Sequence, residues 1–436
     1  MALNIDDSIN ELISNLGKEF KILEYVYNGH SFVEGVTPIY YSGPYWDNRE
    51  ITAAIKSLLI GKWLSSGENV QQFENEFARK INEKAAVMVN SGSSANLVML
   101  AALKKYYKWE DNSEIILSVV GFPTTLSSII MNNLKPVFVD IEMQSLNFDL
   151  NKIQEKITSK TKAIFLSPVL GNPVDMDKLL QICNDNSIQL ILDNCDSVGT
   201  MWKGKYLNEY SIISSYSFYP SHHITTGEGG MVASKNKDLI RLARSFAWWG
   251  RDCFCVGSNN LLPLGCCGNR FDKWLDDYDG IIDHKYVFVN MGMNLKPLDL
   301  QGAIGLIQLS KFDEIHSKRK NNKDVIGKLL KDNIPELIIP DSLNDAEVSW
   351  FGVPIICPDK VFKDKLVAHL EQNKIQTRNY FAGNILLHPA YKHLDDFRKY
   401  PFANQVLDKV LFTGTSPHYN QTIYDYMEKV FKKFNK

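Results

Sequence analysis

Residues 216–233 read YSFYPSHHITTGEGGMVA and place two adjacent histidines, His222 and His223, in a loop rich in Gly and Thr. The loop follows IISSYSF (212–218), which has the composition of a β-strand. In an open α/β sheet, ligands bind outside the carboxyl ends of the strands. The stretch therefore predicts a strand that ends in a functional loop. The local sequence leaves open which of the two imidazoles acts.

Five more β-rich runs alternate with helical segments on the N-terminal side of this stretch. They lie at 85–90, 114–120, 136–141, 162–168 and 189–194. Between the first two, Leu97, Leu100 and Leu103 fall at helical spacing. Strands that alternate with helices predict an α/β fold with a mostly parallel central sheet and helices on both faces.

The rest of the chain predicts further units around that sheet. Residues 1–60 are expected to form an N-terminal helical segment, 61–315 a large domain, and 316–436 a smaller C-terminal α/β domain. Within the large domain, residues 250–285 are turn-rich and contain four of the seven cysteines of the chain. This segment is expected to be an insertion.

Composition excludes several classes of protein. The chain has 436 residues, 44% of them hydrophobic, and a formal net charge of −2. This balance gives no electrostatic reason to bind nucleic acid or an anionic membrane. No apolar run approaches the ~20 residues that span a bilayer, and the N-terminus lacks the layout of a signal peptide. An odd number of cysteines argues against a disulfide framework. We therefore expect a soluble, cytoplasmic protein.

Two turns contain residues suited to a phosphorylated ring cofactor. Gly92, Ser93 and Ser94 lie between a predicted strand and a helix, where backbone N–H groups and the helix dipole attract phosphate. Asp193 ends an apolar strand, and a carboxylate there can keep a pyridine nitrogen protonated. In both cases an ordinary helix cap is the alternative.

Two other residues are weaker candidates on their own. Phe122 follows a predicted strand and can offer a flat apolar face to a ring, although a Phe in the core is more common. Asn294 begins the long helix expected at 294–312, where it is either an anion ligand or a cap.

In order and spacing, these residues resemble the DegT/DnrJ/EryC1/StrS family of sugar aminotransferases, which are fold-type I pyridoxal-phosphate enzymes. The resemblance extends from about Gly43 to near the C-terminus. It implies that Asp193 binds the pyridine nitrogen and that Phe122 covers the ring. It also implies a homodimer in which Asn294 reaches the phosphate bound by the neighbouring subunit. The residues that it assigns to the phosphate are Gly92, Ser93, Ser94 and Ser217.

The family carries a Lys six residues before the Glu of GEGG, and here that position is His222, because the Glu is Glu228. The resemblance thus selects His222 and leaves His223 without a role. Lys forms an imine with the cofactor aldehyde, and an imidazole cannot form that stable bond. The expected cofactor is therefore pyridoxamine 5′-phosphate held without a covalent bond. His222 is expected to act as a base, because imidazole titrates near neutral pH.

One branch of the family has this Lys-to-His change, the nucleotide-4-keto-6-deoxysugar 3-dehydrases. The segment SFYPSHHITTGEGG resembles theirs, and Asp196, Tyr219 and Phe351 stand where aminotransferases commonly carry His or Gln. The resemblance implies removal of the C3 hydroxyl from a nucleotide-linked sugar during deoxysugar synthesis for surface polysaccharides. It places His222, Asp193 and Tyr219 in catalysis and Asp196 at the cofactor. The nucleotide and the sugar stay open, and a sugar 4-aminotransferase is the alternative.

The cysteines bear on how such a sugar is reduced. The iron–sulfur type of 3-dehydrase resembles this chain in having Cys, 57 intervening residues, Cys-x-Cys and a later Cys-Gly. The resemblance implies a [2Fe–2S] cluster, fed by a flavin and iron–sulfur reductase that uses NAD(P)H. The implied ligands are Cys195, Cys253, Cys255 and Cys267, with Cys266 as the alternative to Cys267. A glutamate-dependent dehydrase without a cluster, a zinc site and plain reduced thiols stay open.

Overall fold

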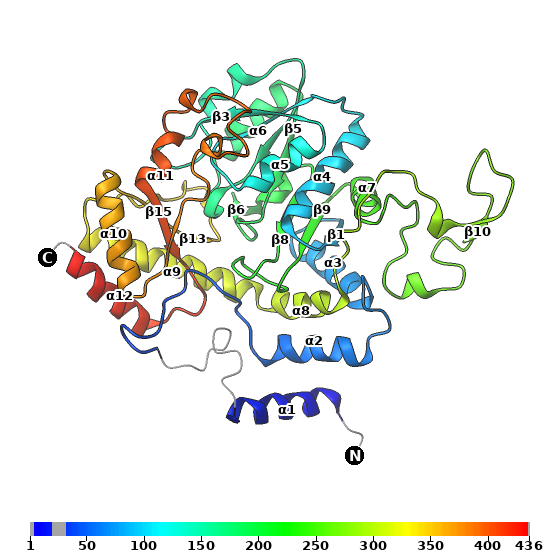
Figure 1. The fold of residues 1–436 in the computed structure, drawn as a ribbon, viewed down its shortest axis with the longest axis horizontal. Coiled ribbons are helices and arrows are strands. Elements are labelled where there is room, and N and C mark those ends of the chain that lie inside the picture. The colour runs from blue at the N-terminus through cyan, green and yellow to red at the C-terminus, as the bar shows by residue number, and fades with distance from the viewer. Residues whose placement is uncertain (1–3, 20–31, 435–436) are drawn as a thin grey trace.

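A computed structural model describes residues 4–19 and 32–434, and its centre is a seven-stranded sheet (Figure 1). The strand order is β1-β9-β8-β5-β4-β2-β3, and β9 alone in this sheet runs antiparallel to its neighbours. The strands are β1 (Ala85–Val89), β2 (Glu114–Ser118), β3 (Lys135–Val139), β4 (Thr161–Leu166), β5 (Gln189–Asp193), β8 (Ser214–Ser217) and β9 (Gly230–Ser234). The predicted mostly parallel sheet is thus confirmed.

β9 is the strand that the sequence did not predict. All five of its residues are buried, so it lacks the alternating pattern of a half-exposed strand. It begins at Gly230, where an added Cβ would stand 2.2 Å from the carbonyl oxygen of Ser91. Glycine is therefore required at this point, because the strand passes directly under the turn that starts α4 (Gly92–Tyr107).

Helices cover both faces of the sheet, because alternate residues of a strand point to opposite sides. Val87 and Val89 of β1 pack on one face together with residues of α4, α5 and α7. Ala86 and Met88 pack on the other face against α3, and α6 covers the remainder of that face. The covering helices not yet given are α3 (Glu68–Lys80), α5 (Pro123–Met131), α6 (Met176–Asp185) and α7 (Lys237–Ala247).

The C-terminal part of the chain forms a second unit with its own core. Its sheet is antiparallel, in the order β13 (Gly352–Ile356), β15 (Val410–Gly414) and β14 (Thr377–Asn379). This sheet packs with α9 (Phe312–Asn333), α10 (Lys360–Gln372) and α12 (Gln421–Phe434). α9 follows directly after α8 (Asp299–Ser310) and runs from the large unit into the small one, across the boundary expected at 315/316.

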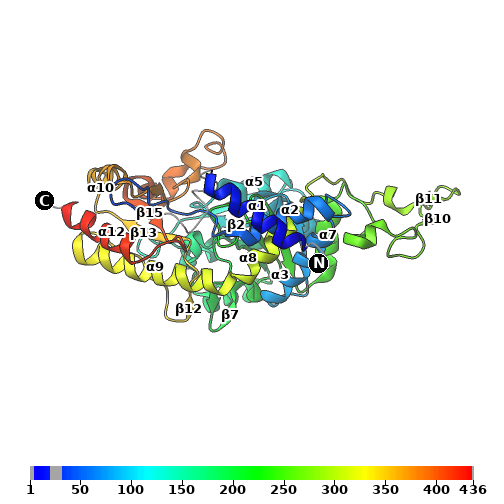
Figure 2. The same ribbon diagram turned by 90° about the horizontal axis from the view of Figure 1, so that it is seen from below.

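Two segments lie outside these units. α1 (Ile5–Glu19) packs on α2 (Asn48–Ile60), which packs on α8. Residues 250–285 project from the body beyond α7, with β10 (Phe271–Asp272) and β11 (Ile282–Asp283) as a short hairpin (Figures 1 and 2). The minor elements are β6 (Met201–Trp202), β7 (Lys205–Tyr206), β12 (Ala346–Glu347) and α11 (Val406–Lys409). None of the helices in the described ranges has the length and apolar character to cross a membrane.

Candidate active site

A cavity of about 670 Å³ opens at the carboxyl ends of β5 and β8, between the central sheet and the C-terminal unit. The predicted site residues that line it are Gly92, Ser93, Phe122, Asp193, Cys195, Asp196, Ser217, Tyr219 and His222. Phe351, Arg378 and Phe381 of the C-terminal part line it as well. The fold therefore brings residues from separate segments of the sequence into one site.

The N-terminus of α4 forms one wall of the cavity. Ser91 caps the helix, since its hydroxyl oxygen accepts a hydrogen bond from the Ser94 N–H at 3.1 Å. Gly92 packs so closely on Ser217 that an added Cβ would stand 2.5 Å from the Ser217 Cβ. The free N–H groups of the first turn thus lie beside a serine hydroxyl, an arrangement suited to phosphate. Ser94 does not line the cavity and serves the cap.

Asp193 is held in a fixed direction at the end of β5. Its carboxylate is 4% exposed and accepts hydrogen bonds at Oδ2 from Asn96 Nδ2 at 2.8 Å and from Thr125 Oγ1 at 2.7 Å. Ser215 in turn donates to the amide oxygen of Asn96. Sequence reasoning missed Asn96 and Thr125, because one is an ordinary helix residue and the other lies in the first turn of α5. Their contacts with Asp193 form only in the folded chain, where α4, α5 and the end of β5 come together.

The site residues fit pyridoxamine 5′-phosphate. Phe122 is 53% exposed and offers its ring to the cavity, with its centre 6.2 Å from that of Phe381. An exposed aromatic ring, a buried carboxylate and a helix N-terminus match the ring, the pyridine nitrogen and the phosphate of this cofactor. Phe122, Asp193 and the start of α4 with Ser217 are the groups that would hold these three parts.

His222 enters the cavity from the loop between β8 and β9. Its Nδ1 lies 3.5 Å from Oδ1 of Asp196 and has no hydrogen-bond partner among the described residues. Burial and then the Arg319 guanidinium lower the pKa of His222 to about 3, against the effect of a hydrogen bond with the Cys195 backbone. Burial and Asp193 raise the pKa of Asp196 to about 8. At neutral pH the imidazole is therefore uncharged.

His223 has a structural role that the sequence did not reveal. It is 3% exposed, does not line the cavity, and its Nε2 donates to the carbonyl oxygen of Ser349 at 2.7 Å. Burial and Arg319 hold its pKa well below the usual value, so the ring stays neutral. The second histidine of the pair thus fastens the loop to the segment that leads into β13.

The other predicted residues lie at the edge of the site or away from it. Tyr219 and Phe351 flank His222, with ring centres 6.4 Å and 5.3 Å from the imidazole. Asn294 is exposed, its backbone pairs with Trp248, and it does not line the cavity of its own chain. Its expected role toward a neighbouring subunit stays a prediction.

The predicted iron–sulfur ligands do not meet within one chain. Cys195 lies in the cavity wall, with its Sγ 3.1 Å from the place of an added Gly92 Cβ. The other cysteines belong to the projecting insertion (Figure 1). Over residues 4–19 and 32–434, no group of three or more His, Cys, Asp or Glu is arranged to hold a metal ion. The described chain therefore does not by itself assemble Cys195, Cys253, Cys255 and Cys267 into a metal site, and this set of cluster ligands stays a prediction.

Three thiols of the insertion do meet, since Cys253 hydrogen-bonds to Cys255 and Cys255 lies beside Cys266. Cys255 Sγ lies 3.2 Å from Cys266 Sγ, and the Cys266 N–H donates to Cys255 Sγ at 3.3 Å. Burial raises the pKa of the Cys255 thiol, but hydrogen bonds from Cys266 and Cys253 outweigh it and leave the pKa lowered. Cys267 instead donates to the Leu264 carbonyl oxygen at 3.6 Å. Cys266, rather than Cys267, is thus the contact of Cys255.

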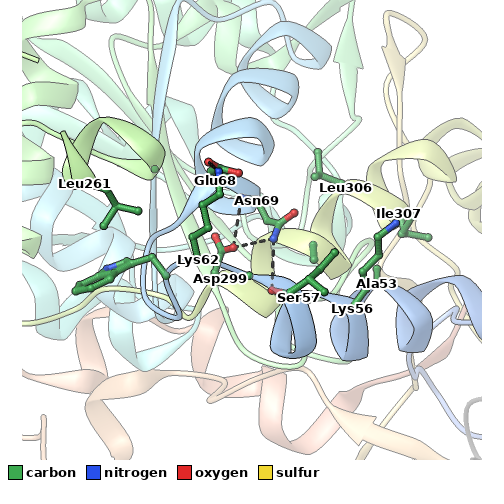
Figure 3. A pocket seen from close by; sticks show the side chains of 15 residues that line it. Ala53, Lys56, Ser57, Lys62, Glu68, Asn69, Leu261, Asp299, Leu306 and Ile307 are labelled. Carbon is green, nitrogen blue, oxygen red and sulfur yellow. Dashed lines mark hydrogen bonds and ion pairs between the residues drawn. The ribbon is translucent and has the colours of Figure 1, made fainter. Parts of the chain in front are cut away.

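A second cavity, of about 330 Å³, lies between α2, α3 and α8 (Figure 3). Its polar groups bond to one another. Asp299 accepts from Asn69 Nδ2 at 2.7 Å and from the Val70 N–H at 3.0 Å, and Lys62 pairs with Glu68 at 3.6 Å. Asp299 thereby caps α3 from another helix. Because these groups already have partners, this cavity is part of the helix packing and not the candidate site.

The model of the DegT/DnrJ/EryC1/StrS aminotransferase family matches residues 46–434, which is most of the chain. The chain belongs to this family. The family and the fold that the motifs predicted are therefore confirmed.

Similar members of the family and solved structures cover nearly the whole chain. It is 37% identical over 417 residues to a dTDP-4-dehydro-2,6-dideoxy-D-glucose 3-dehydratase of Saccharopolyspora spinosa, which spans 93% of this chain and 88% of the relative. It is 32% identical over 446 residues to the lipopolysaccharide biosynthesis protein RfbH of Salmonella typhimurium, at 99% and 98% coverage. The solved E. coli GDP-4-keto-6-deoxy-D-mannose-3-dehydratase with bound hydrated PLP is similar with a TM-score of 0.78 and 29% identity, covering 92% of this chain and 100% of that one.

Proposed function

We propose that this chain removes the C3 hydroxyl of a nucleotide-linked 4-keto-6-deoxy sugar with pyridoxamine 5′-phosphate as cofactor. The main support for this proposal is the set of residues that line the cavity. No lysine lines it in the described part of the chain, and His222 occupies the place from which a lysine would form an imine. Two of the similar proteins are named as nucleotide-sugar 3-dehydratases, which supports the same reaction.

Each residue of the cavity has a separate role in the proposed reaction. Bound pyridoxamine phosphate supplies an amine for the sugar ketone and a ring that accepts electrons. Asp193 holds the pyridine nitrogen, and Ser217 with the start of α4 holds the phosphate. His222, which lines the cavity and whose Nδ1 has no partner among the described residues, is placed to accept the proton. Tyr219, beside His222 at the exposed edge of the cavity, is placed to hydrogen-bond the departing hydroxyl.

The reaction also needs a reductant. Replacing a C–OH bond by C–H consumes two electrons and two protons and releases one water. Since the predicted cysteine set does not converge, we route no electrons through a cluster. The proposed donor is either glutamate, acting through the cofactor, or a separate flavin and iron–sulfur reductase. The donor that supports turnover separates these two, and iron and acid-labile sulfide in the purified protein test the predicted cysteine set.

The test is a product analysis with a matched variant. The protein, loaded with pyridoxamine phosphate, is incubated with CDP-, GDP- and dTDP-linked 4-keto-6-deoxy sugars and with either donor. Mass spectrometry should show a product that lacks one oxygen. His222→Asn should bind the cofactor but form none of this product. An amino sugar formed from glutamate would identify an aminotransferase, and unchanged sugars with every donor would also refute the proposal.

A further inference from the structure

Arg319, in α9, is a fully buried cation without a carboxylate partner. Its side chain is 0% exposed, and none of the ion pairs within 4 Å among the described residues includes it, although the Asp196 carboxyl acts on its charge from farther away. Arg244, the other buried arginine of the described chain, pairs with Glu74 at 2.6 Å. Burial lowers the pKa of Arg319 to about 10, so the guanidinium is still charged at neutral pH. An unpaired buried charge is costly, and its presence calls for a specific reason.

The guanidinium of Arg319 donates to neutral oxygen atoms from four segments of the chain. Its Nη2 donates to the carbonyl oxygen of His222 at 3.2 Å, to that of Ser221 at 3.4 Å, and to the Ser42 hydroxyl at 3.4 Å. Its Nη1 donates to the carbonyl oxygen of Phe351 at 3.2 Å and to Thr415 Oγ1 at 3.3 Å. One side chain thus joins the loop after β8 to the N-terminal segment, to the start of β13 and to the end of β15.

These contacts restrict His222 from several sides. Arg319 holds two consecutive carbonyl groups of the loop, and the His222 N–H donates to the Tyr219 carbonyl oxygen at 3.0 Å. Phe351 packs 5.3 Å from the imidazole, and the same Phe351 ring lies 5.9 Å from the guanidinium. The backbone on both sides of His222 and the direction of its ring are therefore set by groups that contact Arg319.

We propose that Arg319 is a positioning residue for the base, which holds the His222 loop against the C-terminal unit so that the imidazole points at the cofactor. Arg319 does not itself line the cavity, so it acts through His222. The inference rests on the proposed function, because only a base at position 222 gives the positioning a purpose. A displacement of about 1 Å at a reacting group can cost ~100-fold in rate.

The first test compares Arg319→Lys, which keeps the charge, with Arg319→Gln, which keeps part of the hydrogen bonding. In the cofactor-free protein, amide hydrogen exchange at residues 219–224 should be about tenfold faster in Arg319→Gln and less affected in Arg319→Lys. Arg244→Gln is the matched control, since it removes a buried arginine elsewhere. It should lower the free energy of unfolding without a selective change at 219–224.

The second test uses the loaded protein and separates positioning from binding. Exchange of the C4′ protons of bound pyridoxamine phosphate with solvent should slow about 10- to 100-fold in Arg319→Gln. The dissociation constant of the cofactor should stay within about twofold, since Arg319 lies outside the cavity. A folded Arg319 variant with wild-type exchange at 219–224 and at C4′ overturns the proposal. So does an Arg244→Gln protein that slows C4′ exchange equally.

Ser42→Ala decides the question if neither Arg319 variant folds. Ser42 Oγ donates to the Ser221 carbonyl oxygen at 2.6 Å and accepts from Arg319, so its loss weakens the same anchor. Loop exchange should rise and C4′ exchange should fall, each by about fivefold, since a hydrogen bond is worth roughly 1 kcal/mol. Wild-type values for both overturn the proposal. If the proposed function fails, wild-type protein forms no deoxy sugar, while the cofactor-free loop exchange still tests the positioning.

Discussion

Replacing Gly92 by Ala tests whether the close contact between α4 and β8 builds the phosphate site. The added Cβ would stand 2.5 Å from the Ser217 Cβ, 3.0 Å from its Oγ and 3.1 Å from Cys195 Sγ. Ordinary contacts between carbon atoms are about 3.5–4.0 Å, so the first turn of α4 must move outward by about 1 Å. Overpacking of this kind costs about 1–3 kcal/mol of unfolding free energy.

The same movement takes the first N–H groups of α4 away from the phosphate. A hydrogen bond to a charged group is worth about 1.5–3 kcal/mol, so losing one weakens binding of pyridoxamine phosphate by about 10- to 150-fold. Fluorescence titration with the cofactor and urea unfolding measure the two effects. Gly43→Ala is the control, because an added Cβ there has no atom within 4 Å.

The result that would refute this reasoning is specific. If Gly92→Ala binds the cofactor as tightly as Gly43→Ala and unfolds at the same urea concentration, the helix start does not hold the phosphate. If Gly92→Ala is less stable to urea but binds the cofactor with unchanged affinity, the added Cβ does clash with Ser217, but groups other than the start of α4 bind the phosphate.

Three further predictions concern groups at and away from the site. Asn96→Ala removes a donor to Asp193 and the acceptor of Ser215, and should lower the urea-derived free energy of unfolding by about 1–3 kcal/mol. Burial raises the pKa of Glu83 from 4.5 to about 7. The folded protein therefore favours the neutral carboxyl, and the stability that this gives at acid pH is lost as the pH rises through 7. Glu83→Gln should therefore match wild type at pH 4 and exceed it in urea unfolding above pH 7, by up to about 3 kcal/mol. Lys108 ends α4 in the left-handed region at φ 55°, and Lys108→Gly should raise the melting temperature through a gain of about 1 kcal/mol.

Five of the seven strands were predictable because each contains a run of apolar residues between helical segments, and β8 lies within the predicted run 212–218. β9 was not predicted, since it follows a Gly-rich loop with no helix before it. Its pairing to β1 and β8 depends on residues about 145 positions and about 15 positions away. The residues of β9 alone do not indicate such a pairing, so this antiparallel strand was not predicted.

The site was predictable where a residue acts from its own segment. Asp193 ends a predicted strand and Phe122 follows one, and the family resemblance selects His222 by its place six residues before Glu228. Asn96, Thr125 and Arg319 act on residues far along the chain. Arg319, for example, is 97 positions from the carbonyl oxygen of His222 that it holds. Their function is set by contacts that only the folded chain creates.

His222 stands where the family carries a lysine, and in the proposed function it acts as the base. A lone imidazole in water would be partly protonated near neutral pH, and a protonated ring accepts nothing. Here burial and the unpaired charge of Arg319 keep His222 neutral, while Asp196 faces its Nδ1 at 3.5 Å. His223 uses the same neutral form to donate to Ser349. The neutral state of His222 therefore depends first on its burial and then on the Arg319 guanidinium from α9.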